Sequence, residues 1–139
     1  MSHPVYVLDA CAMLAVLSKE QGADKVADIY KMAVLGTIKF VMNKFNLLEV
    51  YYDLYRAYGK AIADKFVEDI KQIPIAINHD FTDEIFTEAG RFKATYKISL
   101  ADSIALAQTV ISDGALVTAD HHEFDVIEEK ENIRFNWIR

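Results

Sequence analysis

The sequence has little of what interrupts or cross-links a chain. It contains one cysteine, Cys11, two prolines and five glycines among 139 residues. A single cysteine cannot form an internal disulfide, and this fits a reducing compartment such as the cytoplasm, where we expect the protein to act. No Pro-, Gly- or Ser-rich stretch divides the chain, and 53% of its residues are hydrophobic. These features predict one compact domain over residues 1–139.

Long apolar runs and basic charge are also scarce. Charged residues interrupt the apolar runs well short of the ~20 residues that a membrane helix needs, and the polar opening Met1–Pro4 lacks the basic region of a targeting segment. The net charge of −6 argues against a broad basic face that grips nucleic acid. It does not exclude a protein whose acidic residues hold a metal, because bound divalent cations reverse the local field.

Strand and helix patterns alternate along the chain. The first strand, Val5–Leu8, is apolar on both faces, as buried parallel strands are. Further strands are predicted at residues 38–42, 75–77, 115–118 and 133–138. Helices are predicted at about 11–18, 22–36, 43–59, 61–73, 99–114 and 121–130, and one more reaches about 95 from a cap at Asp80 or Thr82. This alternation predicts an α/β fold, a three-layer α/β/α sandwich around a mostly parallel five-stranded sheet.

Four carboxylates are predicted to meet at one edge of this sheet. Asp9 directly follows the first strand, and Asp120 comes two residues after the fourth. Glu49 and Asp102 lie in the first two turns of predicted helices that begin at the same edge. Ligands of open parallel sheets bind outside the carboxyl ends of the strands, so these side chains lie where a ligand site is expected.

Converging carboxylates favour a metal site and a particular chemistry. Such groups repel one another unless they are protonated or neutralised by cations. Oxygen ligands without Cys or His select Mg²⁺ or Mn²⁺. A metal pair held by carboxylates suits hydrolysis at phosphorus, since one ion helps to form the attacking hydroxide and the other stabilises the leaving oxygen.

Four segments carry a resemblance to a known family: VYVLDACAMLAVL, NLLEVYYDLYR, SLADSIALAQT and LVTADHHEFD. In this order and spacing they resemble the PIN-domain ribonucleases, particularly the VapC-type toxins of toxin–antitoxin pairs. The resemblance covers nearly the whole chain and implies a central first strand, between the second and the fourth. It further implies that Asp9, Glu49, Asp102 and Asp120 are the catalytic, metal-binding residues, with Asp125 as an additional outer ligand.

The resemblance also implies a function. Members are Mg²⁺- or Mn²⁺-dependent endoribonucleases, commonly homodimers, and a small antitoxin inhibits them by placing its tail in the active site. We therefore expect cleavage of RNA, in single-stranded or loop regions, by metal-activated water. The family usually has Ser or Thr just after the first Asp, whereas this chain has Ala10 and Cys11. Thr118 matches the usual hydroxyl residue before the last acidic motif, and Thr118 and Lys97 are candidate substrate-binding residues.

Several other side chains have simpler interpretations. His121 and His122 are expected at the surface, because neighbouring side chains on a helix point apart and no third His or Cys is near. Cys11 is expected to be a small apolar filler. For the tyrosines of the third helix, core packing is the first interpretation, dimer contact the second and base stacking the third: Tyr51, Tyr52, Tyr55 and Tyr58. The candidate phosphate contacts are Lys44, Arg56, Arg91, Lys93 and Lys97, of which Lys97 is preferred because it shortly precedes Asp102.

Other functions remain open at this stage. A phosphoaspartyl phosphatase is disfavoured, because it needs a second Asp where this chain has Cys11. A receiver domain is disfavoured, because its acidic pair and late lysine are missing. Two alternatives stay: a PIN-like module that binds RNA or protein with weakened catalysis, and an RNA-processing nuclease that is not a toxin.

Overall fold

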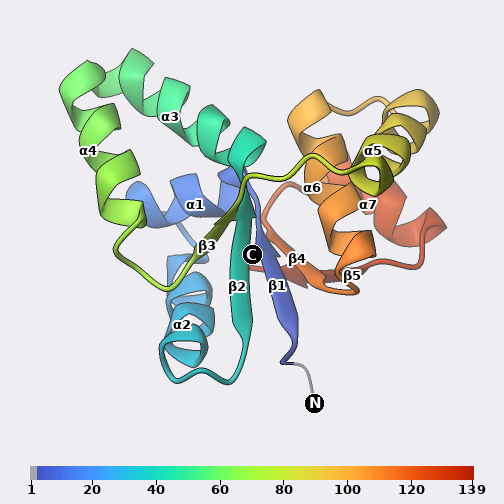
Figure 1. Ribbon diagram of the computed structural model, residues 1–139, viewed down its shortest axis with the longest axis horizontal. Helices are drawn as coiled ribbons and strands as arrows, with labels where there is room; N and C mark the ends of the chain where they lie inside the picture. The colour runs from blue at the N-terminus through green and yellow to red at the C-terminus, as the bar shows by residue number, and fades with distance from the viewer. Residues whose placement is uncertain (1–2) are drawn as a thin grey trace.

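The computed structural model describes residues 3–139, so Met1 and Ser2 of the predicted polar opening lie outside the described residues. Five strands form one sheet in the order β3-β2-β1-β4-β5, and every neighbouring pair is parallel (Figure 1). The first strand is therefore central, as predicted. The strands are β1 (Val5–Leu8), β2 (Lys39–Asn43), β3 (Ala76–Asn78), β4 (Ala115–Thr118) and β5 (Arg134–Trp137).

Helices cover both faces of the sheet, which confirms the three-layer sandwich. Alternate strand residues point to opposite faces. Leu8 and Phe40 pack with side chains of α1 to α4, whereas Val7 and Leu116 pack with those of α5 to α7. Among residues 3–139, no helix is long and apolar enough to cross a membrane. The helices are α1 (Ala10–Leu17), α2 (Ala23–Val34), α3 (Lys44–Tyr58), α4 (Lys60–Ile70), α5 (Asp83–Thr95), α6 (Leu100–Ile111) and α7 (His121–Lys130).

Two predicted helix ends are wrong. Helix α4 was expected to reach residue 73, but it ends at Ile70, and the chain turns there because Ile73 N–H bonds back to the Ile70 carbonyl. Gly114 was expected to end α6, yet the residue with a left-handed backbone is Asp113, with φ of 52°. Gly114 is instead required by close packing, since a Cβ there would lie 2.8 Å from the Val5 carbonyl oxygen.

Core packing was the first interpretation of the α3 tyrosines, and it is wrong for most of them. Tyr52, Tyr55 and Tyr58 are exposed. Tyr51 is half-buried and donates its hydroxyl hydrogen to Asp64 of α4 at 2.7 Å. The reason is visible in Figure 1, where α3 and α4 form an arm that extends beyond the strands. One face of α3 meets the rest of the molecule, and the remainder is open to solvent.

Gly22 allows the backbone of the α1–α2 turn to pack closely against the residue that follows β5. Its φ is +100°, and a Cβ would lie 2.6 Å from the Ile138 carbonyl oxygen. Gly36 has φ of +79° but no atom within 4 Å of such a Cβ.

Gly36→Ala is therefore expected to lower the free energy of unfolding by ~1–2 kcal/mol through backbone strain alone. Gly22→Ala is expected to lose a further ~1–3 kcal/mol through overpacking. Urea unfolding measures both, and equal losses would contradict the close contact.

Candidate active site

Asp9 stands at the carboxyl end of the central strand. Its carboxylate caps α1 by accepting the Ala12 N–H at 2.8 Å, and its own N–H bonds to the Val117 carbonyl of β4 at 3.3 Å. The side chain is only 2% exposed. The strand-to-helix turn thus fixes Asp9 at the switch between β1 and β4, which is where open parallel sheets bind ligands.

Asp120 reaches the same edge from β4. Its carboxylate caps α7 by accepting the Glu123 N–H at 3.2 Å. The Thr118 hydroxyl accepts the Asp120 N–H at 3.0 Å. Thr118 is fully buried. Its hydroxyl therefore fixes the backbone at the start of the Asp120 segment.

Asp102 and Glu49 come from two helices that meet at this edge. Ser99 caps α6 by accepting the Asp102 N–H at 3.1 Å. Asn46, one turn before Glu49 on α3, donates to the Ala101 carbonyl at 3.2 Å. This bond ties the first turn of α6 to α3, so the two carboxylates are held on facing helices.

One pocket of about 300 Å³ brings these groups together. It is lined by Glu49, Asp102 and Asp120, while Asp9 lies buried beneath the wall and is not part of the lining. Two further lining residues were not assigned to the site from sequence, namely Cys11, taken as filler, and Glu20. Glu20 lies in a polar turn between α1 and α2, where no motif or spacing distinguishes it from a solvated residue. The other lining residues are Ala10 and Leu14.

The charges of these carboxylates are poorly compensated. Burial raises the pKa of Asp9 to about 7, although the hydrogen bonds from Thr118 and Ala12 oppose the rise. Burial likewise raises the pKa of Asp102 to about 7, and the charges of Asp120 and Glu49 add to the effect. Burial is also the main cause of the raised pKa of Glu49. Within residues 3–139, none of these four acids has an ion-pair partner.

The donor set fits a hard divalent cation. The carboxylates offer only oxygen ligands, and a bound cation would compensate the buried negative charge that burial and the neighbouring acids make unfavourable. In the described part of the chain, no three His, Cys, Asp or Glu side chains are grouped closely enough to hold one ion as they are placed. Binding would therefore have to draw the carboxylates inward.

The remaining predicted site residues lie outside the pocket lining. Asp125 accepts a 2.7 Å bond from the His121 ring on the outer side of α7, and this bond is the main cause of the raised pKa of His121. Lys97 is exposed in the connection between α5 and α6. His122 is exposed, as expected. Two of the other candidate phosphate contacts are engaged elsewhere: Lys93 bonds to the Ile98 carbonyl, and Arg91 pairs with two glutamates.

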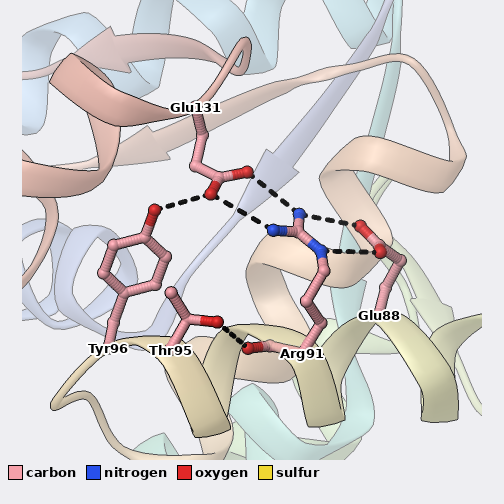
Figure 2. A network of polar contacts seen from close by, with 5 residues as sticks. All are labelled: Glu88, Arg91, Thr95, Tyr96 and Glu131. Carbon is pink, nitrogen blue, oxygen red and sulfur yellow. Dashed lines mark hydrogen bonds and ion pairs between the residues drawn. The ribbon is translucent and has the colours of Figure 1, made fainter.

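Arg91 organises the polar network that supports the Asp102 segment (Figure 2). Its guanidinium makes two hydrogen bonds to Glu88 and two to Glu131, at 2.9–3.2 Å. Tyr96 donates to the same Glu131, and the bond from Arg91 is the main cause of the lowered pKa of this glutamate. The network therefore fastens α5, and the turn that leads into Asp102, to the end of α7.

Loss of this network is expected to weaken the fold. Arg91→Gln should lower the free energy of unfolding by about 1–3 kcal/mol, because it leaves two carboxylates without their charged donor. Arg56→Gln is the matched control, since Arg56 is 76% exposed and lies 3.9 Å from Asp53. That variant removes the same charge and is expected to lose less than about 0.5 kcal/mol. Urea unfolding compares the two, and equal losses would contradict the role of the network.

The fold and the pocket together define a class: parallel α/β sandwiches that gather carboxylates where the central strand meets its neighbours. The sequence pattern of the PIN domain matches residues 6–130. The chain belongs to the PIN domain family, which confirms the resemblance found in the four sequence segments. A comparison with curated proteins finds no match.

Solved structures share the fold at low sequence identity. VapBC-1 from nontypeable Haemophilus influenzae has a TM-score of 0.73 and 15% identity, covering 96% of this chain and 98% of that one. DNA-bound VapBC from Salmonella typhimurium has a TM-score of 0.70 and 13% identity, with both chains covered completely. VapC20 from Mycobacterium tuberculosis, a toxin that cleaves the sarcin–ricin loop, has a TM-score of 0.62 and 14% identity, covering 87% and 94%.

Proposed function

We propose that this chain is a divalent-metal-dependent endoribonuclease, acting in the cytoplasm as the toxin of a toxin–antitoxin pair. The observation that carries the proposal is the pocket itself. Three of the four predicted acids, Glu49, Asp102 and Asp120, line it together with Glu20. The fourth predicted acid, Asp9, is buried, and burial raises the pKa values of Asp9 and Asp102 to about 7. Membership of the PIN domain family adds support.

The proposed roles follow from the positions of the acids. Asp9 and Asp102 are the principal ligands of Mg²⁺ or Mn²⁺, and Glu49 and Asp120 complete the ligand set or orient the attacking water. Such an ion, when bound, lowers the pKa of a water molecule and neutralises charge on the phosphate. Thr118 and Ser99 keep the Asp120 and Asp102 segments in place, since their hydroxyls accept the backbone N–H groups of these two residues. Asp125 could serve as an outer ligand only after its hydrogen bond with the His121 ring is broken.

The proposed substrate is RNA in single-stranded or loop regions, whose bases are accessible. The solved structure of VapC20 is described as that of a toxin that cleaves an RNA loop, and this supports the choice. Exposed Lys97 is proposed to contact a phosphate. Thr118 was predicted to bind substrate, but it is fully buried and its hydroxyl accepts the Asp120 N–H, so no direct contact with substrate is proposed for it. Hydrolysis by an in-line water would leave 3′-hydroxyl and 5′-phosphate ends.

One observation favours a second candidate, a PIN-like binding module with weakened catalysis. The family hydroxyl after the first Asp is replaced by Ala10 and Cys11, and Cys11 stands in the pocket wall. Burial raises the pKa of this thiol to about 11. Cys11 is thus a neutral, weak hydrogen-bonding group where a hydroxyl is usual.

Metal binding and cleavage separate these functions. Calorimetry with Mn²⁺ and Mg²⁺ is run beside incubation with mixed-sequence single-stranded RNA, with and without EDTA. Metal binding, together with metal-dependent cleavage that yields 5′-phosphate ends, is the expected result. A folded chain that binds RNA without cutting it in either metal would overturn the nuclease and favour the binding module.

An antitoxin partner is proposed from the comparisons. The similar structures from Haemophilus influenzae and Salmonella typhimurium are VapBC complexes, the second bound to DNA. A small reading frame beside this gene that encodes a DNA-binding protein would support the toxin role. Cleavage that such a protein does not inhibit would favour an RNA-processing nuclease.

A homodimer is also proposed, through an exposed apolar patch on α3 and α5. Phe45, Leu48 and Tyr52 share one face of α3 and are 41–54% exposed. The ring of Phe81 lies 5.7 Å from Phe45 and 6.1 Å from Phe86, which is 65% exposed. Together these side chains expose on the order of 500 Å². This is a large share of the ~800 Å² that each partner buries in a standard interface.

If the patch is the dimer interface, one negative charge placed within it should break the dimer. Phe86→Glu should shift the chain from dimer to monomer in sedimentation velocity at micromolar concentration, because a buried unpaired carboxylate is costly. Leu35→Glu is the control, since Leu35 is 77% exposed at the end of α2, outside the patch. A dimer that survives Phe86→Glu, or one that Leu35→Glu breaks equally, would contradict the interface.

A further inference from the structure

The pocket has one charged pair at its rim, and its cation has no role in the site described above. Glu20 lines the pocket, and Arg139 Nη1 donates to Glu20 Oε1 at 3.0 Å. Of the ion pairs described for residues 3–139, this is the one that includes a lining carboxylate. An acidic pocket that receives a polyanion benefits from a positive group at its edge.

Hydrogen bonds hold the backbone of Arg139 beside the edge of the sheet at which the acidic pocket lies. Ile138 N–H donates to the Thr118 carbonyl at 3.0 Å, which continues the β4–β5 alignment past the strand ends. The His121 ring bonds through Nε2 to the Arg139 carbonyl at 2.7 Å and stacks on Trp137 with centroids 3.8 Å apart. His121 directly follows Asp120. The Cα and Cβ atoms of Arg139 are thus fixed relative to Asp120.

The side chain, by contrast, is only partly engaged. Both of its described bonds use Nη1, which donates to Glu20 and, at 2.9 Å, to the Gln21 carbonyl. Within residues 3–139, no described bond uses Nη2 or Nε. A guanidinium has five N–H donors in a planar fork that matches two phosphate oxygens. The side chain of Arg139 is 31% exposed, so part of this fork is open to a ligand.

We propose that Arg139 binds a backbone phosphate of the RNA strand at the rim of the pocket, and that Glu20 holds the guanidinium until RNA displaces it. This assignment rests on the proposed ribonuclease function. Arg139 is a phosphate-binding residue in this scheme, and Glu20 competes with the phosphate for it. The alternative is a purely structural clasp that ties the α1–α2 turn to the end of the chain.

The two roles predict different changes in RNA affinity when Arg139 or Glu20 is substituted. If the pair is only a clasp, Arg139→Gln and Glu20→Gln lower the melting temperature alike and leave RNA affinity unchanged. If Arg139 binds phosphate, Arg139→Gln weakens RNA binding, whereas Glu20→Gln strengthens it by freeing the guanidinium. Glu20→Gln also removes a negative charge, so its gain must be shown to require Arg139.

The test measures binding of fluorescent mixed-sequence single-stranded RNA by anisotropy over a range of KCl, in the Asp102→Asn chain with Mg²⁺ to avoid cleavage. Arg139→Gln is expected to weaken binding about five- to tenfold and to reduce the salt slope by about one. Glu20→Gln is expected to tighten binding about threefold, and this gain should vanish when Arg139→Gln is present. Arg134→Gln is the matched control, because Arg134 pairs with Asp113 at the opposite end of the strands.

Three results would overturn the assignment. The first is an unchanged salt slope in Arg139→Gln while the RNA still binds. The second is a gain from Glu20→Gln that persists without Arg139, and the third is an equal loss from Arg134→Gln; each would indicate a general charge effect. No RNA binding by the parent chain, with no cleavage by the unmodified protein, would instead remove the proposed function and this inference with it.

Discussion

Replacing Asp102 by asparagine is expected to reduce RNA cleavage on the order of a thousandfold while the fold is kept. Asparagine has the shape of aspartate, and the cap of α6 uses the backbone N–H of residue 102, which donates to the Ser99 hydroxyl, so the cap survives. It lacks the charge that a divalent cation needs at this position. Metal binding measured by calorimetry should fall together with cleavage, and the circular dichroism spectrum should not change.

A matched substitution tests whether the effect depends on where the negative charge is removed. Asp28→Asn removes the same charge from an exposed site on α2, where Asp28 is 73% exposed, and should leave cleavage and metal binding unchanged. Cleavage that persists in Asp102→Asn, or that falls equally in Asp28→Asn, would remove Asp102 from the catalytic site. Asp125→Asn tests the outer ligand in the same assay, and a loss there would extend the site onto the outer side of α7.

The metal-free protein is expected to be more stable at pH 5 than at pH 8. The pKa values of Asp9 and Asp102 are raised to about 7 in the fold, above the value of 3.8 that applies when the chain is unfolded. Between these values the folded state binds more protons, so the free energy of unfolding falls as pH rises from about 4 to about 7. The loss is expected to be on the order of 3 kcal/mol, after allowance for the partial exposure of Asp102.

Controls separate this effect from other titrating groups. His121, whose pKa is also raised, contributes with the same sign, whereas the lowered pKa of Glu131 matters only below this range. The double variant Asp9→Asn, Asp102→Asn should therefore lose most of the pH dependence seen in thermal melts. Mn²⁺ should raise the melting temperature of the unmodified protein more at pH 8 than at pH 5. A flat profile without metal would contradict the buried carboxyl groups.

The sequence predicted most of the fold because its local signals agree with the packing. Val5–Leu8 is apolar on both faces and is indeed the central strand, covered by helices on each side. The helices predicted to begin at residues 43 and 99 do start there, and Asn43 and Ser99 accept backbone N–H groups as their N-caps. The edge at which Asp9 stands follows from this topology. Its role as a ligand, like the roles of the other acids, stays a prediction.

The missed features depend on contacts that no local pattern encodes. Glu20 and Arg139 are distant in sequence and meet because the end of β5 runs beside the α1–α2 turn, through the gap that Gly22 leaves. The exposure of Tyr52 and Tyr55 depends on where α3 leaves the sheet, which periodicity cannot reveal. Arg91 resembled a free surface cation in the sequence, although two glutamates from separate segments surround it.

The pairing of β1 has a consequence for synthesis on the ribosome. This strand is made first, but one of its two neighbours, β4, is made about a hundred residues later. A nascent chain must therefore carry an open edge on its central strand through most of translation, and such edges invite association with other chains. Asp102 and Asp120 also emerge in this last part. The acidic pocket can form only when the sheet closes, so under the proposed ribonuclease function incomplete chains would be unable to cut the messenger RNA from which they are translated.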